Sequence, residues 1–144
     1  MIRFVHTTVD DIPELQSWIH ADPWHSYKDA AEWWICGGYL MFKLVDAQGD
    51  VIFVRFDKED TQVRLHAQFA PIDVVTERRV AIAINYGITS FISHAIKNGV
   101  MGIVTESVSP KLVAFLTGRM GFKPSTGNEN DYVLNFDLKP SEGQ

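Results

Sequence analysis

Short apolar stretches with a two-residue period, separated by polar turns, predict the strands of this chain. The clearest stretch covers residues 62–70, where apolar side chains alternate with Arg64, His66 and Gln68. Because neighbouring side chains of a strand point to opposite faces, these three polar residues should share one face. Similar stretches predict strands over residues 2–8, 39–45, 51–57, 100–106 and 131–138.

Apolar residues at intervals of three and four predict the helices, which are expected over residues 9–20, 27–38, 76–98 and 109–121. Each begins at or just after an Asp, Ser or Thr that can cap its first N–H groups. The longest is followed by Gly99, at a position that favours a left-handed backbone.

These elements run in the order β-α-α-β-β-β-α-β-α-β. Three meandering strands followed by a helical crossover predict a mixed α/β (α+β) fold, with a mostly antiparallel central sheet and helices on both faces. No repeat or linker divides the chain, so a single domain is expected over residues 1–138. The short polar ending over residues 139–144 is expected to be a disordered tail.

The composition removes several classes of protein. A formal net charge of −5 argues against a nucleic-acid partner, because such proteins use Lys and Arg to neutralise phosphates. Cys36 is the lone cysteine, so no internal disulfide forms, and no Cys/His spacing matches a zinc finger. No signal-peptide pattern or membrane-spanning apolar run is evident, so we expect a cytoplasmic protein with no membrane partner.

Two short sequences stand at informative places in this order. Residues 65–71, "LHAQFAP", end a predicted strand, and residues 120–122, "MGF", follow the last predicted helix. Together with the element order they resemble the GNAT acyltransferase superfamily, in which a related strand ends in a Val-x-Pro-type sequence and Leu-Gly-Phe ends the fourth helix. The resemblance covers essentially the whole chain and implies a GNAT-like fold that binds acetyl-CoA or another acyl-CoA.

The resemblance places the family's central motif, Arg/Gln-x-x-Gly-x-Gly/Ala, on the segment 78–83. In the family this helix start binds the pyrophosphate of coenzyme A, because its first N–H groups lack partners within the helix and carry partial positive charge. The cofactor-binding residues implied here are Arg78, Arg79, Val80, Ala81 and Ala83. Ala81 and Arg79 replace glycines, which worsens the steric fit. The alternative is a plain amphipathic helix start with two solvated arginines.

The resemblance further implies that the pantetheine arm of the cofactor pairs with the main chain of Gln68, Phe69 and Ala70, like an added strand. Family members often carry a tyrosine four residues before the glycine of the Gly-Phe pair, as the acid for the departing thiolate. Thr117 stands at that place. Threonine is a poor general acid, so a transferase built this way should be slow.

The base that takes a proton from the acceptor amine is expected on the two strands that flank the thioester in the family. His66 is the first candidate, because an ordinary histidine pKa near 6.5 suits proton removal at neutral pH. Glu106 is the second, at the end of an apolar strand where burial could raise the pKa of its carboxyl group. Each has a simpler interpretation, as a histidine on a half-exposed strand face and as a solvated or helix-capping carboxylate.

Aromatic residues are concentrated in the first two predicted helices and the loop between them, which borders the acceptor pocket in the family. Trp24 and Tyr27, beside a helix-breaking Asp-Pro pair, are the candidate substrate-binding residues. Trp18, Trp33 and Trp34 lie on apolar stripes and are expected in the core.

Two acidic groups follow predicted strands. Asp46 with Asp50, and Asp57 with Glu59 and Asp60, are interpreted as solvated turn residues. Their spacing lacks the glycine and terminal glutamate of a calcium-binding loop, so no metal site is expected.

Two hypotheses about function remain at this stage. The first is an acyl-CoA-dependent N-acyltransferase that transfers acetyl to the amine of a small molecule or a protein. The second is a GNAT-shaped domain without catalysis that serves as a binding or structural component, similar to some proteins of tailed phages. Anion binding at residues 78–83 would separate the two hypotheses. Either is compatible with a homodimer.

Overall fold

The computed structural model describes residues 1–22, 30–71 and 76–136 of the chain. The elements before the long helix are β1 (Arg3–His6), the 3₁₀ helix η1 (Val9–Asp11), α1 (Ile12–Ala21), the 3₁₀ helix η2 (Ala31–Trp34), β2 (Leu40–Asp46), β3 (Gly49–Glu59) and β4 (Gln62–Phe69). The remaining elements are α2 (Glu77–Lys97), β5 (Gly102–Glu106), α3 (Pro110–Arg119), β6 (Lys123–Pro124) and β7 (Asp131–Asn135).

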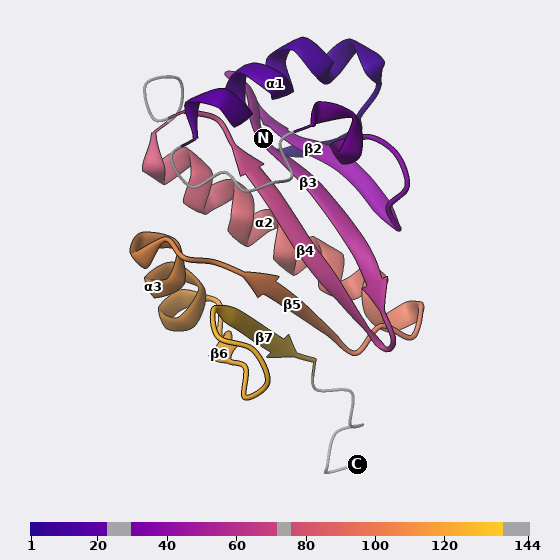
Figure 1. The fold of residues 1–144 in the computed structure, drawn as a ribbon, viewed down its shortest axis with the longest axis vertical. Helices are drawn as coiled ribbons and strands as arrows, with labels where there is room; N and C mark the ends of the chain where they lie inside the picture. The colour runs from indigo at the N-terminus through magenta and orange to yellow at the C-terminus, as the bar shows by residue number, and fades with distance from the viewer. Residues whose placement is uncertain (23–29, 72–75, 137–144) are drawn as a thin grey trace.

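The strands form one seven-stranded sheet in the order β1-β2-β3-β4-β5-β7-β6 (Figure 1). Neighbouring strands are antiparallel except β4 and β5, which run parallel and are connected through α2. The predicted mixed, mostly antiparallel sheet is therefore confirmed. The two-residue strand β6 was not predicted, because so short a strand has no periodicity of its own.

Helices cover both faces of the sheet, and β3 shows this most directly. The Phe53 ring contacts Trp18 of α1 at 5.0 Å between centroids, whereas the Phe56 ring stacks on Phe91 of α2 at 4.0 Å. Residues 51–56 are consequently all buried, which explains why this strand is almost continuously apolar. Gly87 lets α2 lie close to β2, because a Cβ atom at this position would lie only 2.9 Å from Leu44 Cδ1.

The predicted helix ends are confirmed for the two helices that follow β4 and β5. The Thr76 hydroxyl accepts the Arg79 N–H, and the Ser109 hydroxyl accepts the Leu112 N–H, so both helices begin at a side-chain cap. Gly99, beyond the end of α2, has φ +79°, the left-handed backbone expected there.

The helix expected over residues 27–38 is wrong in its described part. Only Ala31–Trp34 is helical, and it is a 3₁₀ turn. The Arg55 guanidinium of β3 donates to the carbonyl oxygens of Trp33 and Cys36, and Trp33 O is an acceptor that a continuing α-helix would need for its own ladder. The competing donor comes from a strand about twenty residues away, so helical periodicity could not reveal it.

Several predictions lie partly or wholly outside the described residues. The start of that second helix falls in 23–29, and the end of the strand expected over 131–138 and the tail over 139–144 fall in 137–144. Within the described ranges, no helix is both long enough and apolar enough to cross a membrane.

Candidate functional site

The parallel strands β4 and β5 pair over part of their length and then separate. Their register runs from Gln62↔Gly102 to Leu65↔Thr105, after which β4 continues to Phe69 beside β3 alone. The Thr105 hydroxyl donates to the Leu65 carbonyl oxygen at 3.0 Å, at the last paired position. A gap therefore opens between the two strands from His66 onward, and Figure 1 shows β4 and β5 diverging.

Beyond Leu65, successive residues of β4 direct their main-chain N–H and C=O groups alternately toward β3 and toward the gap. The Ala70 N–H donates to Val51 O on the β3 side, so it is not available to a ligand in the gap, contrary to the expectation for Ala70. Because Leu65 O faces β5, the alternation turns the main-chain groups of Ala67 and Phe69 toward the gap. Gln68 is buried, and its side-chain amide donates to Asp22 Oδ2 at 2.8 Å.

A polar hollow of about 510 Å³ lies next to this divergence, on the face of the sheet opposite α2. It is lined by Trp33, Asp57, Glu59, Arg64, His66, Glu106, Asn128, Glu129 and Asp131. The structure thus brings both candidate catalytic residues, His66 and Glu106, into the wall of one hollow. The predicted shared face of Arg64, His66 and Gln68 is the face on which it opens.

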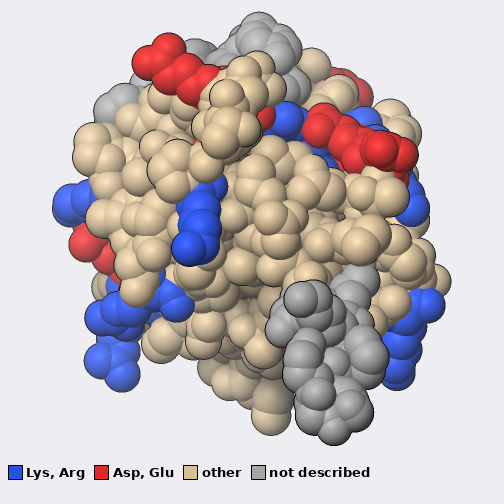
Figure 2. Space-filling view, turned by 90° about the horizontal axis from the view of Figure 1, so that it is seen from below, with Lys and Arg blue, Asp and Glu red and all other residues tan. Residues whose placement is uncertain are grey.

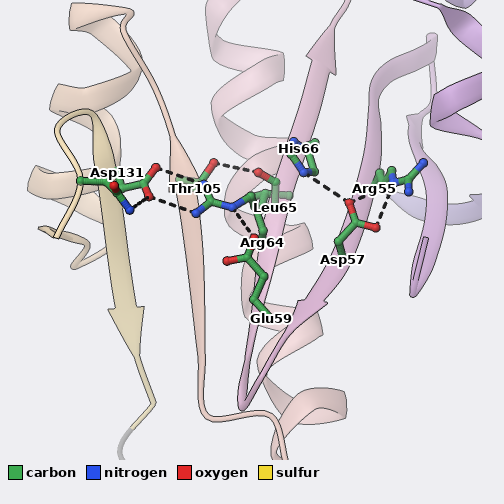
Figure 3. Close-up of polar contacts among 9 residues, drawn as sticks. Arg55, Asp57, Glu59, Arg64, Leu65, His66, Thr105 and Asp131 are labelled. Carbon is green, nitrogen blue, oxygen red and sulfur yellow. Dashed lines mark hydrogen bonds and ion pairs between the residues drawn. The ribbon is translucent and has the colours of Figure 1, made fainter. Parts of the chain in front are cut away.

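His66 is held between a carboxylate and an aromatic ring. Its Nε2 lies 3.4 Å from Asp57 Oδ2, and its ring meets the Trp33 ring edge to face at 4.8 Å between centroids (Figure 3 shows the Asp57 contact). The His66 side chain is 15% exposed. The imidazole is therefore accessible from the hollow, yet two neighbours restrict how it can turn.

Asp57 is itself fixed by Arg55. The Arg55 Nε atom lies 3.1 Å and 3.0 Å from the two Asp57 oxygens, and the guanidinium lies 4.1 Å from the centre of the Trp33 ring. Arg55 is only 7% exposed, and it also donates to the carbonyl oxygens of Trp33, in η2, and of Cys36, just after it. Asp57 is thus part of an ordered ion pair, and its interpretation as a solvated turn residue is wrong.

The opposite wall of the hollow is built around Arg64. Its guanidinium donates to both Asp131 oxygens at 3.0 Å and to Glu59 Oε2 at 2.7 Å (Figure 3). The hydrogen bonds from Arg64 hold the pKa of the Asp131 carboxyl below its usual range, and the same contact raises the pKa of Arg64.

The lining of the hollow carries an excess of negative charge. Arg64 is the permanent cation of the lining. Five lining residues carry carboxylates: Asp57, Glu59, Glu106, Glu129 and Asp131. Glu106 and Glu129 are exposed, and neither forms an ion pair with a described residue. The hollow should therefore attract a cation such as a protonated amine.

At the start of α2, the two arginines have different surroundings. Arg79 donates through Nε and Nη2 to the two Asp46 oxygens, at 2.7 Å each, so its guanidinium is committed to the end of β2. Asp46 is therefore not simply a solvated turn residue. Arg78 is exposed. The first turn keeps N–H groups with no acceptor within the helix, although Thr76 takes that of Arg79.

The remaining predicted site residues differ in accessibility. Val80 and Ala81 are partly exposed, but Ala83 is fully buried in the core and offers no surface to a ligand, so its assignment as a cofactor-binding residue is wrong. Trp24 and Tyr27 lie outside the described residues. Trp18 and Trp34 are buried as expected, whereas Trp33 is half-buried and lines the hollow.

The three residues that support His66 were not assigned to the site from the sequence: Arg55, Asp57 and Trp33. The available signal was Arg55 itself, a charge inside an otherwise apolar strand, with Asp57 two residues later on the same face.

Charge on the rest of the surface is distributed differently. In the view of Figure 2, Lys and Arg side chains lie mostly around the rim, and the broad middle of the face is uncharged. Among the described residues drawn in this view, Lys and Arg form no continuous stripe across the face.

The chain has the fold of the GNAT-family N-acetyltransferases. It is similar to an acetyltransferase of the GNAT family from Staphylococcus aureus Mu50, with TM-score 0.70 and 13% identity over 95% of this chain and 100% of that one. It is also similar to the ribosomal-protein-S18-alanine N-acetyltransferase of Escherichia coli, with TM-score 0.68 and 14% identity over 99% and 98% of the two chains.

A third similar structure contains the cofactor. It is N-acetylglutamate synthase from Neisseria gonorrhoeae, complexed with coenzyme A and N-acetyl-glutamate, with TM-score 0.64 and 10% identity over 97% of this chain and 36% of that one. No protein-family model and no curated protein matches the sequence. At such low identities, these similarities establish the fold alone.

Proposed function

We propose that this chain is a divergent GNAT N-acyltransferase that moves an acyl group, most simply acetyl, from coenzyme A to an amine. The observation that carries the proposal is the separation of β4 and β5 after Leu65 and Thr105, with His66 and Glu106 in the hollow beside it. A thioester held in that gap would lie between main-chain groups of β4 and titratable side chains. Acyl transfer requires both, to hold the reacting groups in place and to move a proton.

The residues present fit an acyl-CoA. Ala67 and Phe69 turn main-chain groups toward the gap, where an extended pantetheine arm could pair with them. The exposed Arg78 and the first N–H groups of α2 suit a pyrophosphate. Ala81 adds one methyl group where glycine is common, and Arg79 is drawn to Asp46. When bound, the cofactor would supply the activated acyl group.

The side chains of the hollow would handle the acceptor. Negative charge on Glu106 and Glu129 would concentrate a protonated amine, of a small molecule or a protein, near the gap. His66 or Glu106 would then take the proton that the amine must lose before it attacks. A cationic acceptor is therefore the substrate class that this lining favours.

Thr117 would contribute little to the departure of the thiolate. Its hydroxyl donates to Val113 O at 2.8 Å within α3, so its proton is already engaged. The leaving group would have to take its proton from water, and we expect a low turnover number.

The proposal is tested by thermal shift and by acetyl transfer. Acetyl-CoA at a hundred times its dissociation constant should stabilise the fold by about 2.7 kcal/mol, and ATP should not. Transfer from acetyl-CoA to a panel of diamines and basic peptides should then be measurable. Binding without transfer to any amine would favour the non-catalytic GNAT-shaped protein, such as a phage component. No shift at millimolar acetyl-CoA would overturn cofactor binding as well.

A further inference from the structure

We infer that Asp57 is a positioning residue for His66, and that the pair, held by Arg55, makes His66 the base of the hollow. The inference rests on the proposed function, since it assigns the proton acceptor of that reaction. It starts from the 3.4 Å contact between His66 Nε2 and Asp57 Oδ2 (Figure 3).

The sheet register explains why the two side chains meet. Arg55 of β3 stands directly opposite His66 of β4, and Asp57 follows Arg55 two residues later on the same face. Asp57 is therefore the diagonal cross-strand neighbour of His66, within reach of its ring. Arg55 fixes the carboxylate through Nε and is anchored by carbonyl oxygens of η2.

The same turn places the imidazole. The Trp33 ring of η2 meets the His66 ring nearly at right angles, and the Arg55 guanidinium lies over the Trp33 ring. His66 is also the first residue of β4 beyond the last β4–β5 pair, so its side chain stands where the gap begins. Asp57, Arg55 and Trp33 thus form one support that orients His66 beside the gap.

This geometry has a chemical consequence. With Asp57 beside Nε2, the carboxylate favours the protonated imidazole ring. In the step, an N–H bond of the acceptor amine breaks, a new N–H bond forms on the imidazole, and the amine nitrogen keeps the electron pair. Asp57 would stabilise the resulting imidazolium.

Other charged side chains lie near His66 in the same hollow and also affect the pH at which its ring is protonated. Among the described residues they are Arg55 and Glu59 of β3, Arg64 of β4, Glu106 of β5, and Glu129 and Asp131 of the β6–β7 segment. Arg55 and Arg64 favour neutral imidazole and the carboxylates favour imidazolium. The decisive quantity is therefore the change in the titration midpoint of His66 when Asp57 alone is replaced.

That change can be measured without substrate. We expect the NMR titration midpoint of His66 in the full chain to fall by roughly half a pH unit or more in Asp57→Asn, because a neighbouring negative charge is lost. Glu59→Gln is the matched control, since Glu59 lines the hollow but contacts Arg64. It should shift the midpoint much less. Asp57→Glu, which keeps the charge, should recover most of the midpoint.

Kinetics then test the role. Asp57→Asn should lower kcat/KM about ten- to a hundredfold, less than the roughly 10²–10⁴-fold typical of losing a general base. The acid limb of its pH profile should move to lower pH. In a His66→Gln background, Asp57→Asn should cause no further loss. An active wild type with the midpoint and kcat/KM unchanged in Asp57→Asn would overturn the inference alone. Acetyl-CoA binding without transfer to any amine would overturn the proposed function and the inference together.

Discussion

Arg64 on β4 and Asp131 on β7 are joined by two hydrogen bonds of 3.0 Å, although β5 lies between their strands. The two side chains reach across the middle strand and join β4 to β7, as Figure 3 shows. The Arg64 side chain is 21% exposed, so water compensates its charge only in part if Asp131 is lost.

Removing the charge of Asp131 should therefore destabilise the fold. We expect Asp131→Asn to lower the free energy of unfolding by about 2–4 kcal/mol at pH 7, measured by urea denaturation. The folded-state pKa of Asp131 lies below the ordinary value of 3.8, so the stability that Asp131 contributes is present above that pH and is lost as the pH falls through the folded-state pKa. The difference between wild type and variant should shrink in acid. An equal difference at pH 3 and pH 7 would contradict the assignment.

The ion pair between Arg79 and Asp46 should also stabilise the fold, but by less. The Asp46 side chain is 17% exposed, against 8% for Asp131, so solvent screens more of the attraction here. Arg79→Ala is expected to cost about 1 kcal/mol in thermal or urea unfolding. In an Asp46→Asn background the same substitution should cost almost nothing, because the partner is already gone.

The neighbouring arginine should matter for the cofactor instead. Arg78→Ala should weaken coenzyme A binding by about 1.5–3 kcal/mol, if a charged hydrogen bond to phosphate is lost. Arg79→Gly, the matched variant one residue away, should leave the dissociation constant unchanged or improve it. Calorimetry of both variants decides. Loss of binding in Arg79→Gly with full binding in Arg78→Ala would show that the motif is placed one residue out of register.

Glu14 gives the fold a pH dependence near neutrality. Partial desolvation, together with the neighbouring Asp50 carboxylate, raises the pKa of Glu14 to about 7. Lys43 bridges Asp11 and Asp50 in the same cluster, at 2.7 Å and 3.0 Å, and already supplies a cation to these carboxylates.

Because the pKa of Glu14 is raised in the folded state, the stability that its protonation contributes is fully present below the unfolded-state pKa, near 4.5. That stability is lost as the pH rises through the folded-state pKa of about 7. Glu14→Gln should therefore stabilise the protein relative to wild type at pH 8 and make little difference at pH 5. Glu14 is exposed, so we expect less than about 1 kcal/mol. Melting temperatures at both pH values test this, with Glu32→Gln as the exposed control.

Local signals in the sequence predicted most of the fold. Caps at Thr76 and Ser109 and the alternation around His66 act within a few residues, and their elements are confirmed. What failed depended on distant partners. Arg55 competes for the carbonyl groups of the second predicted helix. Asp46 looked like a turn residue because its partner Arg79 meets it through the tertiary structure. Asp57 is the exception, because its partner Arg55 lies two residues before it on the same strand.

The candidate site was predictable to the same limited extent. Strand alternation placed His66 on a polar face, and Glu106 at the end of β5 was correctly positioned beside it. Which partner fixes each side chain could not be read from the sequence, because Trp33 and Asp57 reach His66 from other elements.

The final prediction separates the roles of His66 and Glu106. Both line the hollow, but His66 is supported by Asp57 and Trp33, whereas Glu106 is exposed. His66→Gln should therefore lower kcat by roughly 10²–10⁴-fold if it acts directly on the amine, and less if a water chain substitutes. Glu106→Gln should instead raise KM for a cationic amine and weaken the salt dependence of kcat/KM, because it removes attraction rather than a base. Steady-state rates of both variants with one diamine acceptor decide. A large fall in kcat in Glu106→Gln with normal kcat in His66→Gln would reverse the assignment, and full activity in both would exclude both side chains as the base.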